Sequence, residues 1–374
     1  MIRLLGIALL FLLFFLGQRV LYQKLWRREL LVDIRFSQDH ITEGEQGELK
    51  EIIENRKRLP LAMLKVKFRT DRQLLFAGDE SSRTTDQFYR NDIFRVGGRE
   101  RVTRTLKFTG GRRGYYTIEG ADLVAADLFL MNQMTSSVSF RTEVYVYPKP
   151  WVNEEMKRSL VRLNGEQLAK RHLLEDPFEY RGIREYQPYD DMRSINWKAT
   201  AKTGDFKVNQ KNYTSLRNVR IYFNIQDDNI LKKDASVEMA LRITAGLCAC
   251  FLQQGIQTSC CGNGVDILTG KHLEIGARAG EGQLDAVCRA LARLDTEKKP
   301  VSFPDTFEER LLTAEENCLI CFVSPNQYDD FVRLLERLQE SGKDFIWYYP
   351  VEGHQTPKLP PSLEARIQLV HFNL

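Results

Sequence analysis

The sequence predicts an α+β multidomain protein: an N-terminal transmembrane helix, an immunoglobulin-like β-sandwich and a C-terminal α/β domain. An uncharged apolar run comes first, short alternating stretches follow it, and later apolar stretches alternate with amphipathic ones. With 374 residues the chain is long enough for two domains and a short anchor. We therefore divide it into an anchor with a basic flank (1–28), a β-sandwich (30–148), a connector (149–215) and an α/β domain (216–374).

Residues 4–17 form a run without any charged or polar side chain. A helix needs about 20 apolar residues to cross the hydrocarbon core, so this run is short. It reaches that length if Arg19 extends its charge to the surface and Val20–Tyr22 continue the span, with Tyr22 and Trp26 at the interface. A signal peptide requires a cleavage site of small residues, and none follows this run. A core helix of a soluble domain is a second alternative, but here Leu, Ile and Phe surround every face of the helix. The run therefore predicts a membrane anchor.

Basic residues predict the orientation of this anchor. Arg3 precedes the run, whereas Arg19, Lys24, Arg27 and Arg28 follow it. Because basic residues concentrate on the cytoplasmic side, we expect a single-pass protein of the cell membrane with its body in the cytoplasm.

Composition limits the partners and the compartment. Basic residues exceed acidic ones by only 4 charges, with no long basic stripe, so we expect no nucleic-acid partner. Six of the seven cysteines lie in segments that have the pattern of buried helices and strands, which predicts small buried side chains rather than zinc ligands or disulfides. Free thiols in this number fit a reducing compartment. The seven are Cys248, Cys250, Cys260, Cys261, Cys288, Cys318 and Cys321.

The two large domains differ in their periodicity. Residues 30–148 contain short alternating stretches separated by turn signals such as Gly97-Gly98, which predicts a β-sandwich. Residues 154–171 of the connector have a helical pattern. After residue 216, strand-like runs such as NVRIYFNI and CLICFV alternate with amphipathic helices, which predicts a mainly parallel sheet with helices on both faces.

The connector contains a segment, residues 176–210, that is dense in both charged and aromatic side chains. Asp190 or Asp191 is expected to cap a helix running from Met192 to Lys198. Two interpretations are open. Exposed Arg, Tyr and Trp would form a docking surface, since these residues are common binding anchors. Alternatively, the alternation of aromatics with charges favours a half-buried, ion-paired joint that locks the domains together.

This segment closely resembles the signature of the domain of unknown function 58 family. Glu179, Arg184 and Tyr186 match the first part of the signature, and residues 188–198 match its central part. Tyr189 stands where Gly is usual, and Lys202 where Arg is usual. The layout of anchor, β-rich domain, signature and α/β domain also resembles the family.

The resemblance implies a C-terminal von Willebrand factor A-like domain and a MoxR-type AAA ATPase as the protein partner. The expected function is a membrane-tethered, non-enzymatic protein-interaction adaptor. The signature residues expected to interact are Glu179, Arg181, Arg184, Tyr186, Asp190, Asp191, Arg193, Asn196, Trp197 and Lys198.

Von Willebrand A domains often carry a metal site that begins with Asp-x-Ser-x-Ser after the first strand. The matching stretch here, residues 224–228, lacks the first Asp and both Ser. Asn224, Gln226 and Asp228 offer oxygens, but two of these side chains are neutral amides, so they are weak candidates and we expect no metal or cofactor. A metal-dependent binding module is nevertheless an alternative function.

Catalytic motifs are missing from the sequence. The five histidines form neither H-x-H nor H-E-x-x-H, and there is no P-loop and no G-x-S-x-G. We therefore expect no enzyme and name no catalytic residue, with an undetected hydrolase as the remaining alternative.

Overall fold

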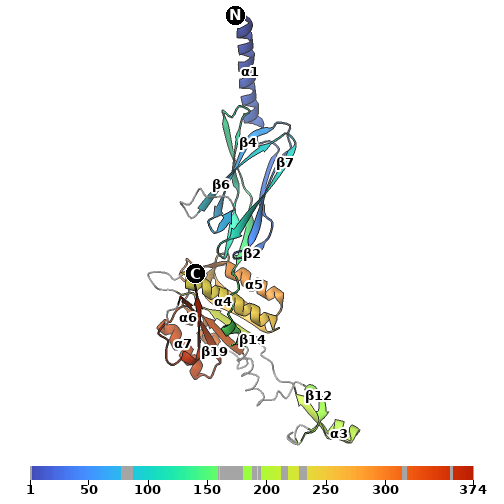
Figure 1. The fold of residues 1–374 in the computed structure, drawn as a ribbon, viewed down its shortest axis with the longest axis vertical. Helices are drawn as coiled ribbons and strands as arrows, with labels where there is room; N and C mark the ends of the chain where they lie inside the picture. The colour runs from blue at the N-terminus through green and yellow to red at the C-terminus, as the bar shows by residue number, and fades with distance from the viewer. Residues whose placement is uncertain are drawn as a thin grey trace. The chain divides into compact units, whose positions relative to one another are not determined.

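The computed structural model of the chain describes residues 2–76, 87–158, 160, 180–187, 192, 195–211, 218–226, 234–313, 318–353 and 357–373. These residues belong to two compact units, each described by itself below (Figure 1). Unit 1 comprises Met1–Lys149 with Leu291–Arg293, and unit 2 comprises Pro150–Ala290 with Leu294–Leu374.

Unit 1 begins with helix α1 (Ile2–Leu25), which is long and apolar enough to cross a membrane. Helix α4 (Asp234–Gln253) of unit 2 passes the same test of length and composition, but 72% of it is buried, as in a core helix. Only 6% of the α1 span is buried. The predicted N-terminal apolar helix is therefore confirmed.

The rest of unit 1 is a β-sandwich, as predicted. One antiparallel sheet has the order β1-β3-β7-β5, a second has the order β10-β9-β4-β6, and a smaller sheet joins β2, β11 and β8. The strands are β1 (Leu30–Phe36), β2 (His40–Thr42), β3 (Gln46–Asn55), β4 (Leu61–Asp71), β5 (Leu74–Phe76), β6 (Gln87–Val96), β7 (Glu100–Gly110), β8 (Gly114–Ile118), β9 (Ala121–Ala126), β10 (Gln133–Val138) and β11 (Thr142–Tyr147).

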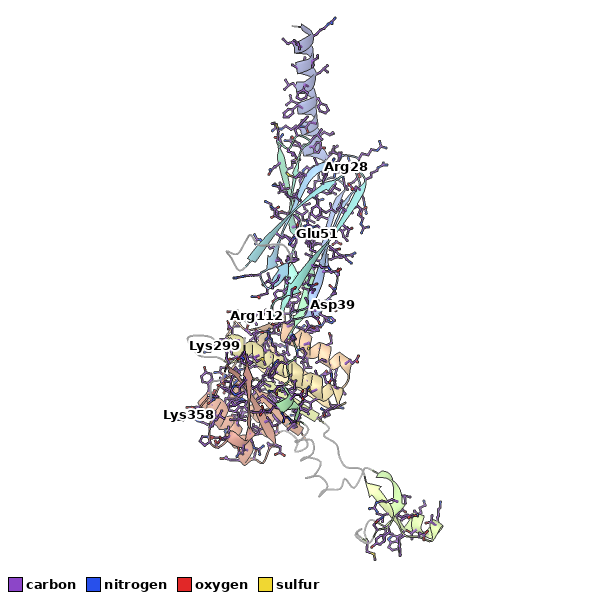
Figure 2. All side chains as sticks on the ribbon, in the orientation of Figure 1. Arg28, Asp39, Glu51, Arg112, Lys299 and Lys358 are labelled. Atoms are coloured by element: carbon purple, nitrogen blue, oxygen red, sulfur yellow. The ribbon has the colours of Figure 1, made fainter. Side chains whose placement is uncertain are left out.

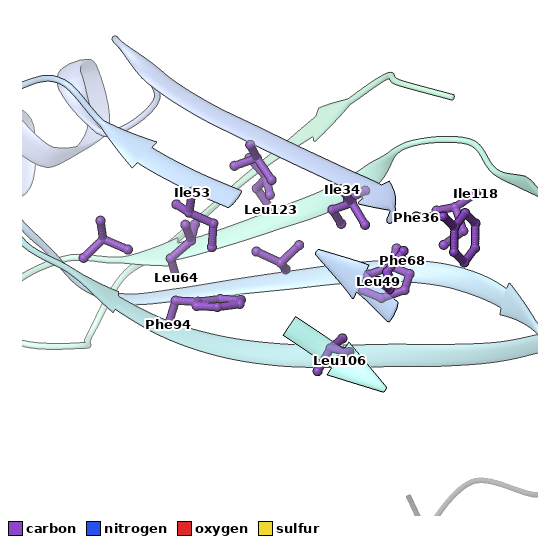
Figure 3. Close-up of a cluster of buried hydrophobic side chains, with 14 of the residues drawn as sticks. Ile34, Phe36, Leu49, Ile53, Leu64, Phe68, Phe94, Leu106, Ile118 and Leu123 are labelled. Carbon is purple, nitrogen blue, oxygen red and sulfur yellow. The ribbon is translucent and has the colours of Figure 1, made fainter. Parts of the chain in front are cut away.

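The sandwich core is built from alternate residues of the two facing sheets (Figure 3). Strand β1 buries every second side chain, so Ile34 and Phe36 face inward while Asp33 and Arg35 face solvent. Leu49 and Leu64, from opposite sheets, are fully buried. Truncating a leucine in such a core costs about 2–5 kcal/mol, because a cavity is added to the lost burial.

A charged cluster around Glu51, whose place is labelled in Figure 2, interrupts this apolar core. Arg90 Nε lies 2.6 Å from Asp92 Oδ2, and Arg104 lies 2.8 Å from Asp92 Oδ1. Glu51 is 1% exposed beside them. Burial, followed by the negative charge of Asp92, raises the pKa of Glu51 to about 8, against the opposing effect of the two arginines. Strand β6 was not predicted from the sequence, because its buried positions include this Arg90 and Asp92.

In unit 2 a mainly parallel sheet has the order β16-β15-β14-β18-β19-β20, with β17 pairing β15. Only β16 and β17 pair antiparallel with their neighbour. The elements are β14 (Asn218–Phe223), β15 (Gln257–Asp266), β16 (His272–Arg278), α5 (Glu281–Ala292), β17 (Leu294–Asp295), α6 (Phe303–Leu312), β18 (Cys318–Val323), α7 (Asp329–Glu340), β19 (Phe345–Glu352), η2 (Glu364–Arg366) and β20 (Ile367–Phe372).

Helices cover both faces of this sheet, as the sequence predicts. On one face Tyr222 and Phe322 pack with Phe303 of α6 and Phe331 of α7. Cys261 of β15 belongs to this packed cluster, whereas its neighbour Cys260 points to the opposite face, where it lies near Cys248 of α4. The sequence did not indicate α6, which is ten residues long and has Pro304 in its first turn, or the last strand β20.

Six of the seven cysteines are buried and Cys250 is half-buried, which confirms the predicted packing role. Burial raises the pKa of the Cys261 thiol to about 11 and that of Cys288 to about 12. These thiols are therefore protonated at neutral pH and are poor nucleophiles.

Glu51→Gln is expected to remove a pH dependence of stability. The folded chain keeps the Glu51 proton up to a pKa of about 8, whereas the unfolded chain loses it near 4.5. The folded state therefore binds more protons between these values, and the free energy of unfolding falls as the pH rises through this window. The variant should gain on the order of 4 kcal/mol over wild type between pH 5 and pH 8.5, which is about three pH units at about 1.36 kcal/mol each.

Thermal unfolding of the full chain in detergent at the two pH values measures this difference. Glu48→Gln, on the same strand, is the control and should keep the wild-type pH dependence. Equal pH slopes in both variants would contradict the assignment of the slope to Glu51.

Candidate functional site

The described part of the signature segment folds into a small unit of its own. Strands β12 (Tyr180–Glu185) and β13 (Lys207–Lys211) pair antiparallel, and α3 (Trp197–Thr203) lies between them in the chain. Glu185 faces Lys207 across the pair, with Lys207 Nζ 3.1 Å from Glu185 Oε1. Ile195 forms a bridge with Val208, and both side chains are buried.

Helix α3 begins later than the sequence predicts. Asn196 is its N-cap: the side-chain oxygen accepts a hydrogen bond from the Ala199 N–H at 3.0 Å. The predicted continuous helix from Met192 to Lys198 is wrong, because Ile195 pairs with β13 and is extended rather than helical. The predicted caps, Asp190 and Asp191, lie outside the described residues. The helix ends at Gly204, which has a φ of 80°.

Aromatic side chains of this unit gather on its surface. Trp197 is 63% exposed and Phe206 54% exposed, with their ring centroids 6.4 Å apart in an edge contact. Tyr186 lies 5.9 Å from Phe206, and Lys198 is exposed beside Trp197. We call Tyr186, Trp197, Lys198 and Phe206 the aromatic surface.

The structure brings together only part of the predicted signature set. Tyr186, Asn196, Trp197 and Lys198 meet on or beside the aromatic surface. Arg184 is half-buried on β12 and donates to the Glu185 carbonyl at 3.0 Å. Glu179, Asp190, Asp191, Arg193 and the side chain of Arg181 lie outside the described residues. Phe206 was missed as a site residue, although its position at the start of a short strand after the Gly204 turn was a usable signal.

A second candidate site lies at the carboxyl edge of the parallel sheet, where such sheets usually hold ligands. Three buried amides meet there from neighbouring strands: Asn224 after β14, Asn263 on β15 and Asn326 after β18. Asn263 Nδ2 donates to Asn224 Oδ1 at 2.7 Å and to the Val301 carbonyl at 3.0 Å. We call these three residues the amide cluster.

Of the three side-chain oxygens considered as metal ligands, that of Asn224 is taken up by hydrogen bonds in the amide cluster. Asn224 Oδ1 accepts a second hydrogen bond from the Gln226 N–H at 3.0 Å, and Asn326 donates to the Gln226 carbonyl. Asp228 lies outside the described residues. Within the described part of the chain, no group of three His, Cys, Asp or Glu side chains could hold a metal ion. Asn263 and Asn326 were not predicted, although polar residues at the ends of parallel strands would have indicated them.

No protein-family model and no curated protein matches this chain. Among solved structures, the sporulation control protein Spo0M of Bacillus subtilis aligns at TM-score 0.19 and 11% identity, over 42% of this chain and 58% of Spo0M. A cohesin module from a Clostridium perfringens family 33 glycoside hydrolase aligns at TM-score 0.22 and 12% identity, over 32% of this chain and 95% of the module. The CARDB domain of a Pyrococcus furiosus protein aligns at TM-score 0.20 and 14% identity, over 31% of this chain and 91% of the domain. TM-scores this low assign neither a family nor a function.

Asn263→Ala is expected to destabilise unit 2 through unpaired polar groups. The substitution removes the donor to Asn224 and the acceptor of the Ile225 N–H, which lies 3.0 Å from Asn263 Oδ1. Each buried polar group left unpaired costs about 1–3 kcal/mol, so the free energy of unfolding should fall by about 2–4 kcal/mol. Denaturant unfolding of the full chain measures the loss.

Gln257→Ala is the matched control, because Gln257 is an exposed residue on the same strand. Its effect should stay within about 0.5 kcal/mol. A loss in Asn263→Ala no larger than in the control would show that the amide cluster does not stabilise the sheet edge.

Proposed function

We propose that this chain is a membrane-tethered, non-enzymatic adaptor that binds a MoxR-type AAA ATPase. The resemblance of the signature segment to the domain of unknown function 58 family suggests both the class of protein and the partner. The same resemblance suggests that unit 2 is a von Willebrand factor A-like domain, and its mainly parallel sheet with helices on both faces is compatible with that.

The aromatic surface is the observation that carries the proposal. Its helix buries no side chain, so the energy of folding does not explain a large ring at Trp197. Exposed aromatic residues next to basic ones are the composition of binding hot spots, because they bury large areas and lose little entropy on binding. The surface therefore supports docking of a protein partner.

Two further observations support the adaptor interpretation. Helix α1 has the length and composition of a tether. At the carboxyl edge of the sheet, the amide cluster consists of neutral side chains that hydrogen-bond one another. Neutral, mutually bonded amides offer neither a nucleophile nor a general base, which favours a binding role over a catalytic one.

Trp197→Ala is expected to weaken capture of the ATPase. Loss of an aromatic hot spot costs at least about 2 kcal/mol, which is roughly a 30-fold loss of affinity. The tagged full chain is purified from solubilised membranes, and the co-purified MoxR-type ATPase is quantified. Val301→Ala, an exposed apolar residue outside the signature segment, is the control and should capture the wild-type amount.

Two outcomes contradict the proposal in different ways. If wild-type protein captures no such ATPase, the partner is wrong. If Trp197→Ala captures as much as the control, the aromatic surface is not the docking site.

A further inference from the structure

The loops of unit 1 that adjoin the end of α1 form one continuous end of the sandwich. The Arg56 N–H donates to the Glu29 carbonyl at 3.0 Å, and the Arg99 N–H donates to the Lys57 carbonyl at 2.9 Å. Gln18 Nε2 donates to Asp127 Oδ2 at 3.3 Å. Four segments thus meet here: residues 24–29, 54–60, 97–101 and 127–132. We call them the helix-side loops.

The helix-side loops are strongly basic. Segments 24–29, 54–58 and 97–101 hold eight Lys or Arg and three Glu, although the whole chain is nearly balanced. The exposed cations are Lys24, Arg28, Arg56, Arg58, Arg99 and Arg101. Burial, followed by the nearby charge of Arg27, lowers the pKa of Lys57 to about 8, as expected where cations crowd.

The fourth segment is apolar at its tip. Leu128, Phe129, Leu130 and Met131 are 45%, 38%, 55% and 73% exposed, which is unusual for four consecutive residues of a soluble loop. The Phe129 ring does not point away from α1. Its centroid lies 6.4 Å from Phe11, 6.3 Å from Phe14 and 5.6 Å from Phe15.

The loop is held in this exposed conformation. Asp127 is 1% exposed and accepts hydrogen bonds from the Met131 N–H at 2.9 Å and the Asn132 side chain at 2.7 Å. Leu130 has a φ of 60°, which L side chains rarely adopt. In the described residues, the positive-φ residues other than glycine are Glu29, Arg99 and Leu130, and all of them lie in the helix-side loops.

The length of α1 explains why such a loop would be useful. Gln18, Tyr22 and Trp26 bury one face of α1 in unit 1, so residues 2–17 are the stretch that the sandwich core leaves uncovered on every face. At 1.5 Å per residue these span about 24 Å, against a hydrocarbon core of about 30 Å. Phe129 packs beside the last two turns of this stretch.

We propose that the helix-side loops are a membrane-docking face, in which residues 128–131 insert among lipid acyl chains and the surrounding cations contact anionic headgroups. The proposal rests on α1 being a bilayer tether, as proposed above. If the rings of Phe11, Phe14 and Phe15 lie in lipid, then Phe129 lies in lipid too, because its ring contacts all three. The cations that surround the apolar loop complement the anionic surface of a bilayer.

Site-specific photocross-linking in nanodiscs tests the insertion. A diazirine amino acid replaces Leu130 in the full chain, and adducts with phosphatidylcholine and phosphatidylglycerol are counted by mass spectrometry. The matched control is Leu75, which is also 55% exposed but pairs with Thr109 at the other end of β7. We expect lipid adducts at position 130 at least tenfold above those at position 75.

The two proposals fail differently in this experiment. A chain that stays in the nanodisc but gives no excess of adducts at position 130 overturns the docking face alone. A chain that does not stay in the nanodisc overturns both the tether and the docking face.

The cations are tested with the same readout in mixed bilayers. Arg28→Gln, Arg58→Gln and Arg99→Gln are combined, and the control combines Arg35→Gln, Arg72→Gln and Lys107→Gln elsewhere on the sandwich. Each cation near an anionic surface changes partitioning roughly fivefold, so the phosphatidylglycerol share of the adducts at position 130 should fall at least about fivefold in the first variant. An equal share in both variants overturns the headgroup contact.

Discussion

The packing of the end of α1 into the sandwich is the constraint on which the rest of unit 1 depends. Gln18, Tyr22 and Trp26 are spaced four residues apart, so they share one face of the helix, and that face is buried. Tyr22 donates to the Pro60 carbonyl at 2.9 Å, and β1 starts five residues after the helix ends. No flexible linker therefore separates the apolar helix from the folded body of unit 1.

This packing corrects the sequence-based interpretation of the same rings. Tyr22 and Trp26 were expected at the membrane interface, as such rings usually are after an apolar helix. Instead they are 3% and 6% exposed and belong to the sandwich core. The sequence could not show this, because a ring that anchors in headgroups and a ring that packs on protein have the same local pattern. For the tether proposed above, the consequence is a helix that is fixed to the sandwich over its last turns.

Much of the fold was predictable because burial dictates periodicity. Strand β1 repeats with a period of two and helix α7 with a period of about 3.6, as the predicted sandwich and α/β domain require. The prediction failed where a strand buries charged side chains, and where pairing with a distant segment sets the bounds of an element. Strand β6 carries Arg90 and Asp92 inward, and the start of α3 is set by the bridge between Ile195 and Val208. The amide cluster could not be predicted without the strand order, because only that order places residues far apart in the sequence at one edge of the sheet.

Three features of the molecule bear on the proposed adaptor function. An apolar helix continues into a sandwich, the sheet edge of unit 2 is closed by neutral amides, and a small unit exposes Trp197 and Phe206. The most direct test is the fraction of full chain that remains in the membrane pellet after an alkaline carbonate wash. We predict that wild type remains in the pellet and that Leu10→Arg, which places a charge at a cost of about 3 kcal/mol in the apolar run, shifts toward the supernatant. Wild-type protein in the supernatant would contradict the tether.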